Sequence, residues 1–487
     1  MTVLLDLPTE ILMQVISLLC PHCIIESQNL GRCTCQEERP PNSDNKLSNS
    51  AQLRKDLSSL SKTCKALQVL AQTALYHSPT PLIGRHLLLA RTLASRHDLA
   101  LHVKELHLGK WSVFEKDVTP ELQDLFNDII NRVGVPPDLL KELEGEWPRD
   151  WLLDGGEGRE TKRYVSPMPD ITRDGKGKYF FDERVRVVDS LIVTLVPNVE
   201  HIHLEPLSIP HFPFCAPESL PRLTDFTLQL SHTSGGVKID CVEGILGAAP
   251  ALERFRGIGI NGMSKGLTHS NLRSIDLDQS TLGKSHINAI MTGFPRLEIF
   301  GYEADYKITC EEREALPRDL GNALLIRKDT LKDVDIDLSR SKIYLSYTRL
   351  HVGDAMPSLK EMVQLESLGL DRDVMFVPRE LRADGDLDGD DESETDNDDV
   401  IQNLEQFGMR KNRDLVVDFL PPSIRYFKLY DRHGLLFPDL VKLAETAPEK
   451  FPALKKVRFW GFDEDQRMAL RGSFRRVGVK CTHGGYL

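Results

Sequence analysis

The chain has 487 residues, 40% of them hydrophobic, and a formal net charge of −12. The stretch from Asp384 to Asp399 holds ten of the acidic residues and no basic one, so the rest of the chain carries a net charge of only −2. This balance gives no support for a broad surface that binds nucleic acid or anionic membranes, and no apolar stretch approaches the roughly 18 to 20 residues that span a bilayer. We therefore expect neither nucleic acid nor membrane as a partner.

The N-terminal sequence and the cysteines indicate a compartment. Met1 to Pro8 has no basic segment ahead of an apolar run, so it does not read as a secretory signal. The chain has nine cysteines, and in a reducing compartment free thiols or metal ligands are expected rather than disulfides. We therefore expect a protein of the cytoplasm, the nucleus or both.

Two segments near the N-terminus have helical periodicity. After Pro8, which a first helical turn tolerates, apolar residues follow at helical spacing from Ile11 to Leu19. A second patterned segment runs from about Leu53 to Tyr76. Its apolar stripe consists of Leu57, Leu60, Cys64, Leu67, Leu70, Ala71 and Leu75. Periodicity alone predicts a small helical core.

The N-terminal residues also resemble a known family. Leu7-Pro8-Thr9-Glu10-Ile11-Leu12, followed by Leu57, Leu60, Ser61, Thr63-Cys64-Lys65 and Leu67, is similar to an F-box spanning residues 1–80. The resemblance implies a helical module that docks on a Skp-family adaptor of a cullin ubiquitin ligase. It assigns the following residues to the adaptor contacts or to the core of the module: Leu5, Leu7, Pro8, Ile11, Leu12, Val15, Leu57, Leu60 and Leu67. The alternative is a generic helical cap on the rest of the chain.

An insertion at about residues 20–50 separates helices that F-boxes usually join closely. It begins with Cys20-Pro21-His22-Cys23 and continues with Cys33-Thr34-Cys35. Four thiolates, Cys20, Cys23, Cys33 and Cys35, can close a tetrahedral site for structural zinc, with His22 as a substitute ligand. In the alternative interpretation, Cys20 is buried at a helix end and the other cysteines lie in a polar loop.

A phrase of three apolar residues, with two variable residues between the first pair and one between the second, recurs along the chain. Its copies begin at Val103, Val199, Leu223, Leu252, Leu272, Leu297, Leu331, Leu365, Ile424 and Leu454. Recurrence at intervals of roughly 20 to 35 residues is typical of a solenoid. The long gap after Val103 predicts a helical insertion at about 110–180.

Several copies follow a helical stripe and a proline, so that one unit reads helix, proline, strand. Stacked units of this kind form a parallel sheet on one face and helices on the other. Residues 81–487 therefore resemble an irregular leucine-rich repeat, an α/β solenoid with strands on its concave face. A last helix is expected over 462–477, and the acidic tract at about 380–400 is expected to be a disordered loop.

Side chains alternate along a strand, so the variable positions of the phrase predict a row of surface residues. The candidate substrate-binding positions are His203, Asp276, Asp278, Asp335, Asp337, Asp371, Tyr430, Arg458 and Trp460. They make the middle of the face acidic and its C-terminal end basic and aromatic, with Tyr430 and Trp460 as anchors for a partner. The alternative is that these are ordinary solvated strand residues and that Trp460 packs under the C-terminal cap.

No catalytic motif has support in the sequence. Gly257-x-Gly259-x-x-Gly262 has the spacing of a dinucleotide-binding loop, but Ser264-Lys265-Gly266 after it is a poor helix start. We expect a non-catalytic substrate-recognition subunit of an SCF-type cullin ubiquitin ligase, bound to a Skp-family adaptor and to an unknown protein substrate. The alternative function is a leucine-rich-repeat scaffold without a ligase role.

Overall fold

The computed structural model describes residues 6–20, 22–24, 43–81, 86–109, 124, 127–131, 183–205, 212–229, 236–264, 266–305, 307–308, 312–341, 354–375, 415–431 and 434–484. The predicted acidic loop at 380–400 and most of the predicted insertion at 110–180 lie outside these residues. The chain forms two compact units, Met1–Ser231 with Cys241–Glu253, and His232–Asp240 with Arg254–Leu487. The predicted domain boundary near residue 80 stays a prediction.

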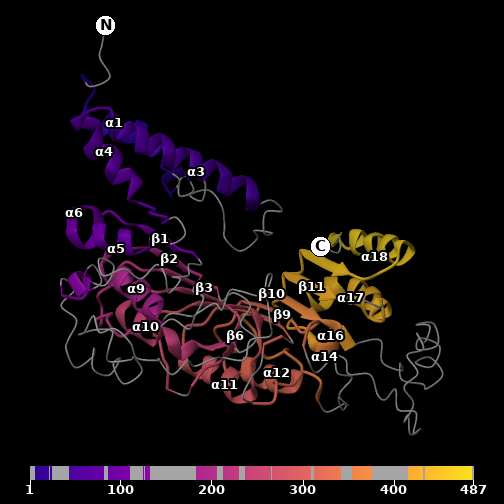
Figure 1. Ribbon diagram of the computed structural model, residues 1–487. Helices are drawn as coiled ribbons and strands as arrows, with labels where there is room; N and C mark the ends of the chain where they lie inside the picture. Colours follow the sequence, from indigo (N-terminus) through magenta and orange to yellow (C-terminus); the bar gives the residue numbers. More distant parts are fainter. Residues whose placement is uncertain are drawn as a thin grey trace, which may run out of the picture. The chain divides into compact units, whose positions relative to one another are not determined.

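The first unit combines N-terminal helices with a short parallel sheet (Figure 1). Its elements are α1 (Thr9–Ser17), α3 (Ser43–Leu60), α4 (Lys65–Leu75), α5 (His86–Ser95), α6 (His97–Ala100), β1 (Glu105–Leu108), α9 (Glu183–Thr194), β2 (His201–Leu204), β3 (Asp225–Gln229) and α10 (Glu243–Ala248). Strand β2 pairs in parallel with β1 on one side and with β3 on the other.

The N-terminal helices pack on one another, with α4 against both α1 and α3. Pro8 directly precedes α1 and Glu10 lies in its first turn, where a missing N–H costs nothing and a negative charge is favourable. The patterned segment from Leu53 to Tyr76 forms parts of two helices rather than one, because the chain turns between Leu60 and Lys65. In that turn, the Thr63 hydroxyl donates to the carbonyl of Leu60 at 2.8 Å.

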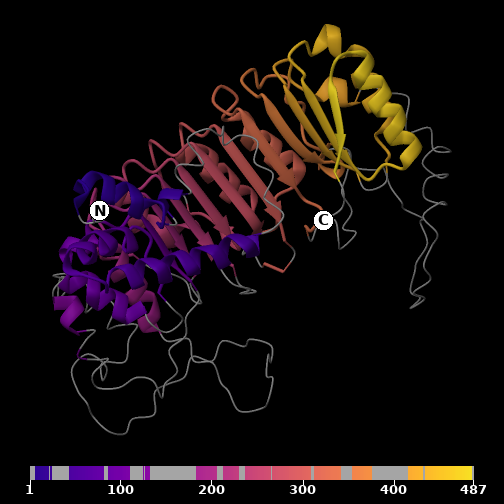
Figure 2. The same ribbon diagram turned by 90° about the horizontal axis from the view of Figure 1, so that it is seen from above.

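The second unit is built on an eight-stranded parallel sheet, in the order β5-β7-β8-β9-β10-β11-β12-β13 (Figure 2). These strands are β5 (Arg254–Ile258), β7 (Ser274–Ser280), β8 (Ile299–Ala304), β9 (Asp333–Asp337), β10 (Ser367–Asp371), β11 (Tyr426–Tyr430), β12 (Lys456–Trp460) and β13 (Lys480–His483). The pair β4 (Val237–Lys238) and β6 (Ile260–Gly262) forms a separate small sheet, and η5 (Ile239–Val242) follows β4.

Helices connect the strands of the second unit. They are α11 (Lys284–Gly293), α12 (Pro317–Leu325), α14 (Arg372–Met375), α16 (Leu415–Phe419), α17 (Phe437–Lys450) and α18 (Glu464–Arg476). In Figure 1, α11, α12 and α14 lie below the strands, on the same side of the sheet. The predicted C-terminal helix corresponds to α18, which Asp463 and Gln466 cap reciprocally.

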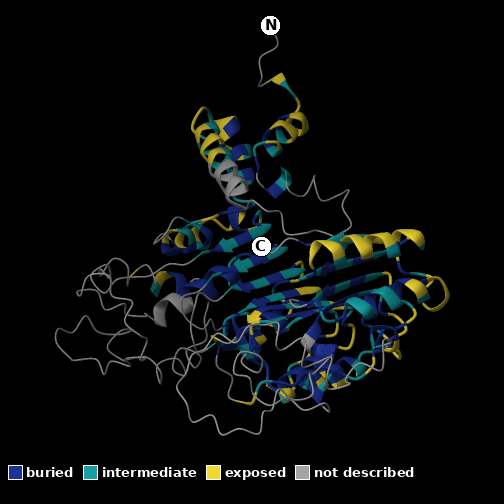
Figure 3. Cartoon of the chain, turned by 90° about the vertical axis from the view of Figure 1, so that its right-hand side faces the viewer, coloured by how far each residue is buried: buried dark blue, intermediate teal, exposed yellow. Residues whose placement is uncertain are grey.

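The recurring apolar phrase marks the strands. Each of its ten copies becomes a parallel strand, and each strand begins two residues after the first apolar residue of its copy. Buried and less buried residues then alternate, as in β9 and β11 (Figure 3). The predicted α/β fold with a large parallel sheet is therefore confirmed.

Two further findings concern the glycine-rich segment and the helices. Gly257 lies in β5 and Gly262 in β6, so the glycines of the dinucleotide-like spacing open no helix that could receive a phosphate. Among the described residues, no helix is both long and apolar enough to cross a membrane.

Candidate functional site

Helix α1 carries apolar side chains on two faces. Leu12 and Ile16 are buried, with 6% and 2% of their surface exposed. Ile11, Val15 and Leu18 follow one another at helical spacing on the other side and are 41%, 45% and 70% exposed. The helix therefore contributes one face to the core and has a second apolar face that the described residues leave exposed.

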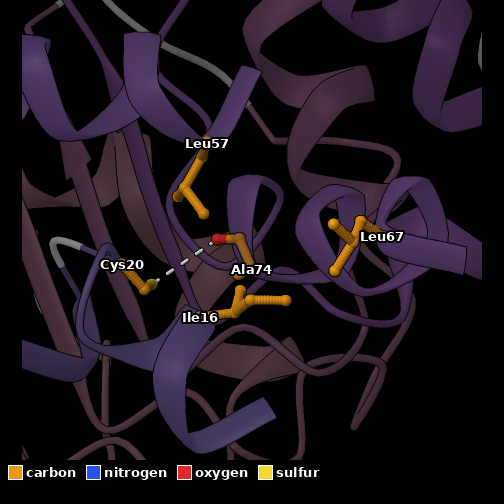
Figure 4. Close-up of a cluster of buried hydrophobic side chains, with 5 residues drawn as sticks. All are labelled: Ile16, Cys20, Leu57, Leu67 and Ala74. Carbon is orange, nitrogen blue, oxygen red and sulfur yellow. Dashed lines mark hydrogen bonds between the residues drawn. The ribbon is translucent and has the colours of Figure 1, made fainter. Parts of the chain in front are cut away.

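The buried face belongs to a small hydrophobic cluster, in which Cys20 lies beside Ile16 and Ala74 (Figure 4). The buried members of this cluster are Ile16, Cys20, Leu57, Leu67 and Ala74. The Cys20 sulfur lies 3.5 Å from the carbonyl oxygen of Ala74. This contact joins the segment after α1 to the last turn of α4.

From the sequence, nine residues could belong either to the adaptor contacts or to the core of the helical module. Their burial in the structure divides them. Leu12, Leu57 and Leu67 are buried, Leu7 and Leu60 are half-buried, and Pro8, Ile11 and Val15 are exposed. Leu5 lies outside the described residues. Leu18 was not predicted, although its spacing of seven from Ile11 already places it on the same helical face.

Two cysteines and two histidines meet after α1 and α4. The ligand atoms of Cys20, His22, Cys23 and His77 all lie within 4.8 Å of one another. The Nδ1 atom of His77 is 3.7 Å from the Cys20 sulfur and 3.5 Å from the Cys23 sulfur. The Nδ1 atom of His22 is 3.9 Å from the Cys23 sulfur. These four side chains could hold a metal ion such as zinc.

The surroundings of this Cys/His cluster favour a thiolate at Cys20. A hydrogen bond with Cys23 lowers the pKa of the Cys20 thiol most, and His77 adds to the effect against the opposing influence of burial. The resulting pKa is about 4, compared with an ordinary value of 9.0. A thiolate is the form of cysteine that binds metal ions.

The composition of this cluster differs from the set predicted from the sequence. Cys20 and Cys23 belong to it, whereas Cys33 and Cys35 lie outside the described residues. His22, the substitute ligand, is also a member. His77 was missed because it follows Cys23 by 54 residues in the sequence, and the helices bring it back.

On the sheet of the second unit, the predicted positions Asp276, Asp335 and Arg458 belong to one continuous row of strand residues, in which Gly301 and Gly369 are buried. Strand register pairs the following residues successively: Arg256, Asp276, Gly301, Asp335, Gly369, Lys428 and Arg458. All lie between buried apolar neighbours, as a strand period of two requires. We call this set the strand row.

Charged side chains in the strand row are paired with one another. Lys428 Nζ lies 2.9 Å from Asp335 Oδ2, although β10 separates their strands. Gly369 of β10 makes this possible, because a Cβ atom at that position would collide with the Asp335 carboxylate. At the other end, Arg256 lies between Asp276, at 3.6 Å, and Asp278.

Two predicted surface positions are wrong. Asp278 and Asp371 are only 7% and 5% exposed, so neither belongs to an open acidic face. Asp278 is covered by its ion pair with Arg256. Asp371 is the last residue of β10 and directly precedes α14. Asp337 remains half-buried, and its carboxylate accepts a hydrogen bond from the amide of Ser339 at 2.8 Å.

Two aromatic side chains lie next to the C-terminal end of the strand row, at the ends of β11 and β12. Tyr430 and Trp460 stack with ring centroids 4.3 Å apart and an angle of 17° between the rings. The Arg458 guanidinium lies 4.7 Å from the centroid of Trp460. The indole also lies against Gly484, where a Cβ atom would overlap it. Trp460 is thus held on both sides by residues of the chain, and its role as an anchor for a partner stays a prediction.

His203 lies in the first unit, on β2. Its neighbours in the register are His107 on β1 and Thr227 on β3, and the two histidine rings are 5.4 Å apart. Its Nε2 atom is 3.2 Å from the Glu205 carboxylate. His203 therefore belongs to a separate local group of histidines and acids.

Comparisons with known proteins give no relative. No model of a known protein family matches the sequence, and no curated protein matches it.

Proposed function

We propose that this chain is the substrate-recognition subunit of an SCF-type cullin ubiquitin ligase, acting in the cytoplasm or nucleus. Its N-terminal helices, which resemble an F-box, bind a Skp-family adaptor, and its leucine-rich-repeat body binds the protein to be ubiquitylated. The chain performs no bond chemistry. It acts through proximity, because a tethered substrate meets the ubiquitin carrier at a high effective concentration.

The exposed apolar face of α1 is the observation that best supports the adaptor site. Ile11, Val15 and Leu18 leave 41%, 45% and 70% of their surface in water, while their neighbours fill the core. Covering such a face with a partner removes apolar area from water, which is favourable by about 25 cal/mol per Å². Because these residues directly follow the Leu-Pro opening of the F-box-like sequence, a Skp-family adaptor is the partner that fits.

The strand row supports the second half of the proposal. It offers a protein substrate a line of charges and, at one end, the rigid pair Tyr430 and Trp460 with Arg458 above it. Aromatic and arginine side chains are the commonest energetic centres of protein interfaces. A structural zinc ion also belongs to this proposal, as a component that holds the N-terminal helices.

Co-purification tests the adaptor site. Tagged wild-type chain is expected to bring down the Skp-family adaptor, and Ile11→Asp with Val15→Asp is expected to reduce its recovery by about tenfold or more, since both charges would enter the contact. Leu88→Asp is the matched control, because Leu88 lies on α5 and is similarly exposed, at 43%. Folded wild-type chain that recovers no adaptor would contradict the proposal.

Substrates are sought among proteins that accompany the adaptor complex and accumulate when proteasomal degradation is blocked. A substrate held by the strand row is expected to disappear from the complex with Arg458→Ala and Trp460→Ala, while the adaptor stays. Loss of the adaptor together with the substrate in these variants would argue against separate binding sites.

A further inference from the structure

We infer that Cys20, His22, Cys23 and His77 bind one zinc ion, which fastens the segment after α1 to the end of α4. The inference concerns the stability of the first unit and does not depend on the ligase role. It differs from the four-thiol site of the sequence prediction, because half of its ligands are imidazoles and one comes from a distant segment.

The distances between the ligand atoms suit a tetrahedral ion. Zinc bonds of about 2.3 Å to sulfur and about 2.0–2.1 Å to nitrogen, at tetrahedral angles, place the sulfur and nitrogen atoms of two ligands about 3.6 Å apart. The sulfur to Nδ1 distances here are 3.5, 3.7 and 3.9 Å. Three of the six distances between the ligand atoms therefore lie close to those of a tetrahedral zinc site, and all six are within 4.8 Å.

The donor set selects the metal and its role. Two thiolates and two neutral imidazoles suit zinc and disfavour magnesium or calcium, which prefer oxygen ligands. Four protein ligands leave no open position for water or substrate, so the role is structural rather than catalytic.

The positions of the ligands show what the ion would join. Cys20 lies in the hydrophobic cluster beside Ile16 and Ala74 (Figure 4). His77 follows α4, and its carbonyl oxygen accepts hydrogen bonds from the amides of Lys104 and Glu105, both at 2.9 Å, where β1 begins. One ion would thus connect α1, α4 and the first strand through residues that are close in space but far apart in sequence.

Metal analysis of the full chain tests the inference. Protein purified without chelators and supplied with zinc is expected to contain about one equivalent after dialysis. Cys20→Ser and His77→Ala are expected to lose it, whereas His77→Cys, which restores a ligand, is expected to retain it. His102→Ala is the matched control, because its ring lies 6.5 Å from that of His77 without belonging to the cluster.

Cys33→Ser with Cys35→Ser separates this site from the four-thiol alternative. The double variant is expected to keep its zinc. Wild-type chain with less than about half an equivalent would overturn the inference. So would zinc that survives in His77→Ala but is lost from the Cys33 and Cys35 double variant.

If a substituted chain fails to fold, thermal unfolding of the wild-type chain still tests whether zinc binds. Chelation of wild-type zinc is expected to lower the midpoint of thermal unfolding, and added zinc is expected to restore it, because binding free energy contributes to folding. His77→Cys then decides the assignment: a folded His77→Cys chain without zinc would contradict the role of His77.

Discussion

The N-terminal helices and the sheet of the second unit present different surfaces to water. On α1, Ile11, Val15 and Leu18 are apolar, exposed and covered by nothing within the described part of the chain. On the strand row, Lys428 and Asp335 are half-buried and already paired with each other. A partner gains free energy by covering the first surface, but must replace existing interactions on the second. We therefore propose that α1 supplies most of the affinity for a partner and the strand row most of the selectivity.

The largest expected effect is on the free energy of unfolding, and it should differ between the core of the N-terminal helices and their exposed face. Leu57→Ala is expected to lower the free energy of unfolding of the first unit by about 2–5 kcal/mol, because Leu57 is completely buried. Val15→Ala should change it by less than about 0.5 kcal/mol. Denaturant unfolding measures both, and equal effects of the two substitutions would contradict the division of the apolar residues.

A smaller effect on the free energy of unfolding is expected from the aromatic pair next to the strand row. Tyr430 and Trp460 stack closely, and such a pair contributes about 0.5–1.5 kcal/mol beyond the burial of its area. A double-mutant cycle with Tyr430→Leu and Trp460→Leu should return a coupling free energy of this size. Additive effects would mean that each ring contributes to stability independently. The stacking of Tyr430 on Trp460 would then add no free energy of its own.

The pH dependence of the first unit should reflect Glu105. Burial alone would raise the pKa of this carboxyl, but the hydrogen bond from His107 and the charge of that imidazole outweigh it and lower the pKa from 4.5 to about 2. Its contribution to stability is therefore present above pH 4.5 and is lost as the pH falls from 4.5 towards 2. Melting temperatures of wild type and Glu105→Gln, measured with chelator present, should converge over this range. A difference between the two melting temperatures that widens towards low pH would contradict the lowered pKa of Glu105.

The smallest effect is expected at the ion pair that crosses β10. Lys428→Ala removes the pair, and Gly369→Ala is expected to displace the Asp335 carboxylate and break the same contact. Each should cost about 0.2–1 kcal/mol because the pair is partly exposed. The two substitutions together should cost less than the sum of their separate effects, as calorimetric unfolding would show. Full additivity would mean that Gly369 is not needed for the pair.

The sequence predicts the strands of this protein well because their apolar spacing is local. Ten copies of the phrase gave ten strands, each beginning at the same offset. Strand β13 was missed because Lys480–His483 has no apolar triplet and pairs only with β12. The break between α3 and α4 was missed because the apolar stripe continues across it, while the polar residues Ser61 to Thr63 form the turn.

The candidate sites could be predicted only where neighbours in the sequence determine them. Ile11 and Val15 follow from helical spacing, and the strand row follows from the period of the strands. His77 could not be predicted, because the return of α4 alongside α1 determines its place. The burial of Asp278 depends likewise on an arginine from another strand.

The most direct test of the account is a calorimetric titration of purified Skp-family adaptor into the full chain. We expect one adaptor to bind per chain, binding to be lost with Ile11→Asp and Val15→Asp, and the affinity to be unchanged by Trp460→Ala. Absence of binding to the folded wild-type chain, or undiminished binding to the Ile11 and Val15 double variant, would contradict the assignment of α1 as the adaptor site.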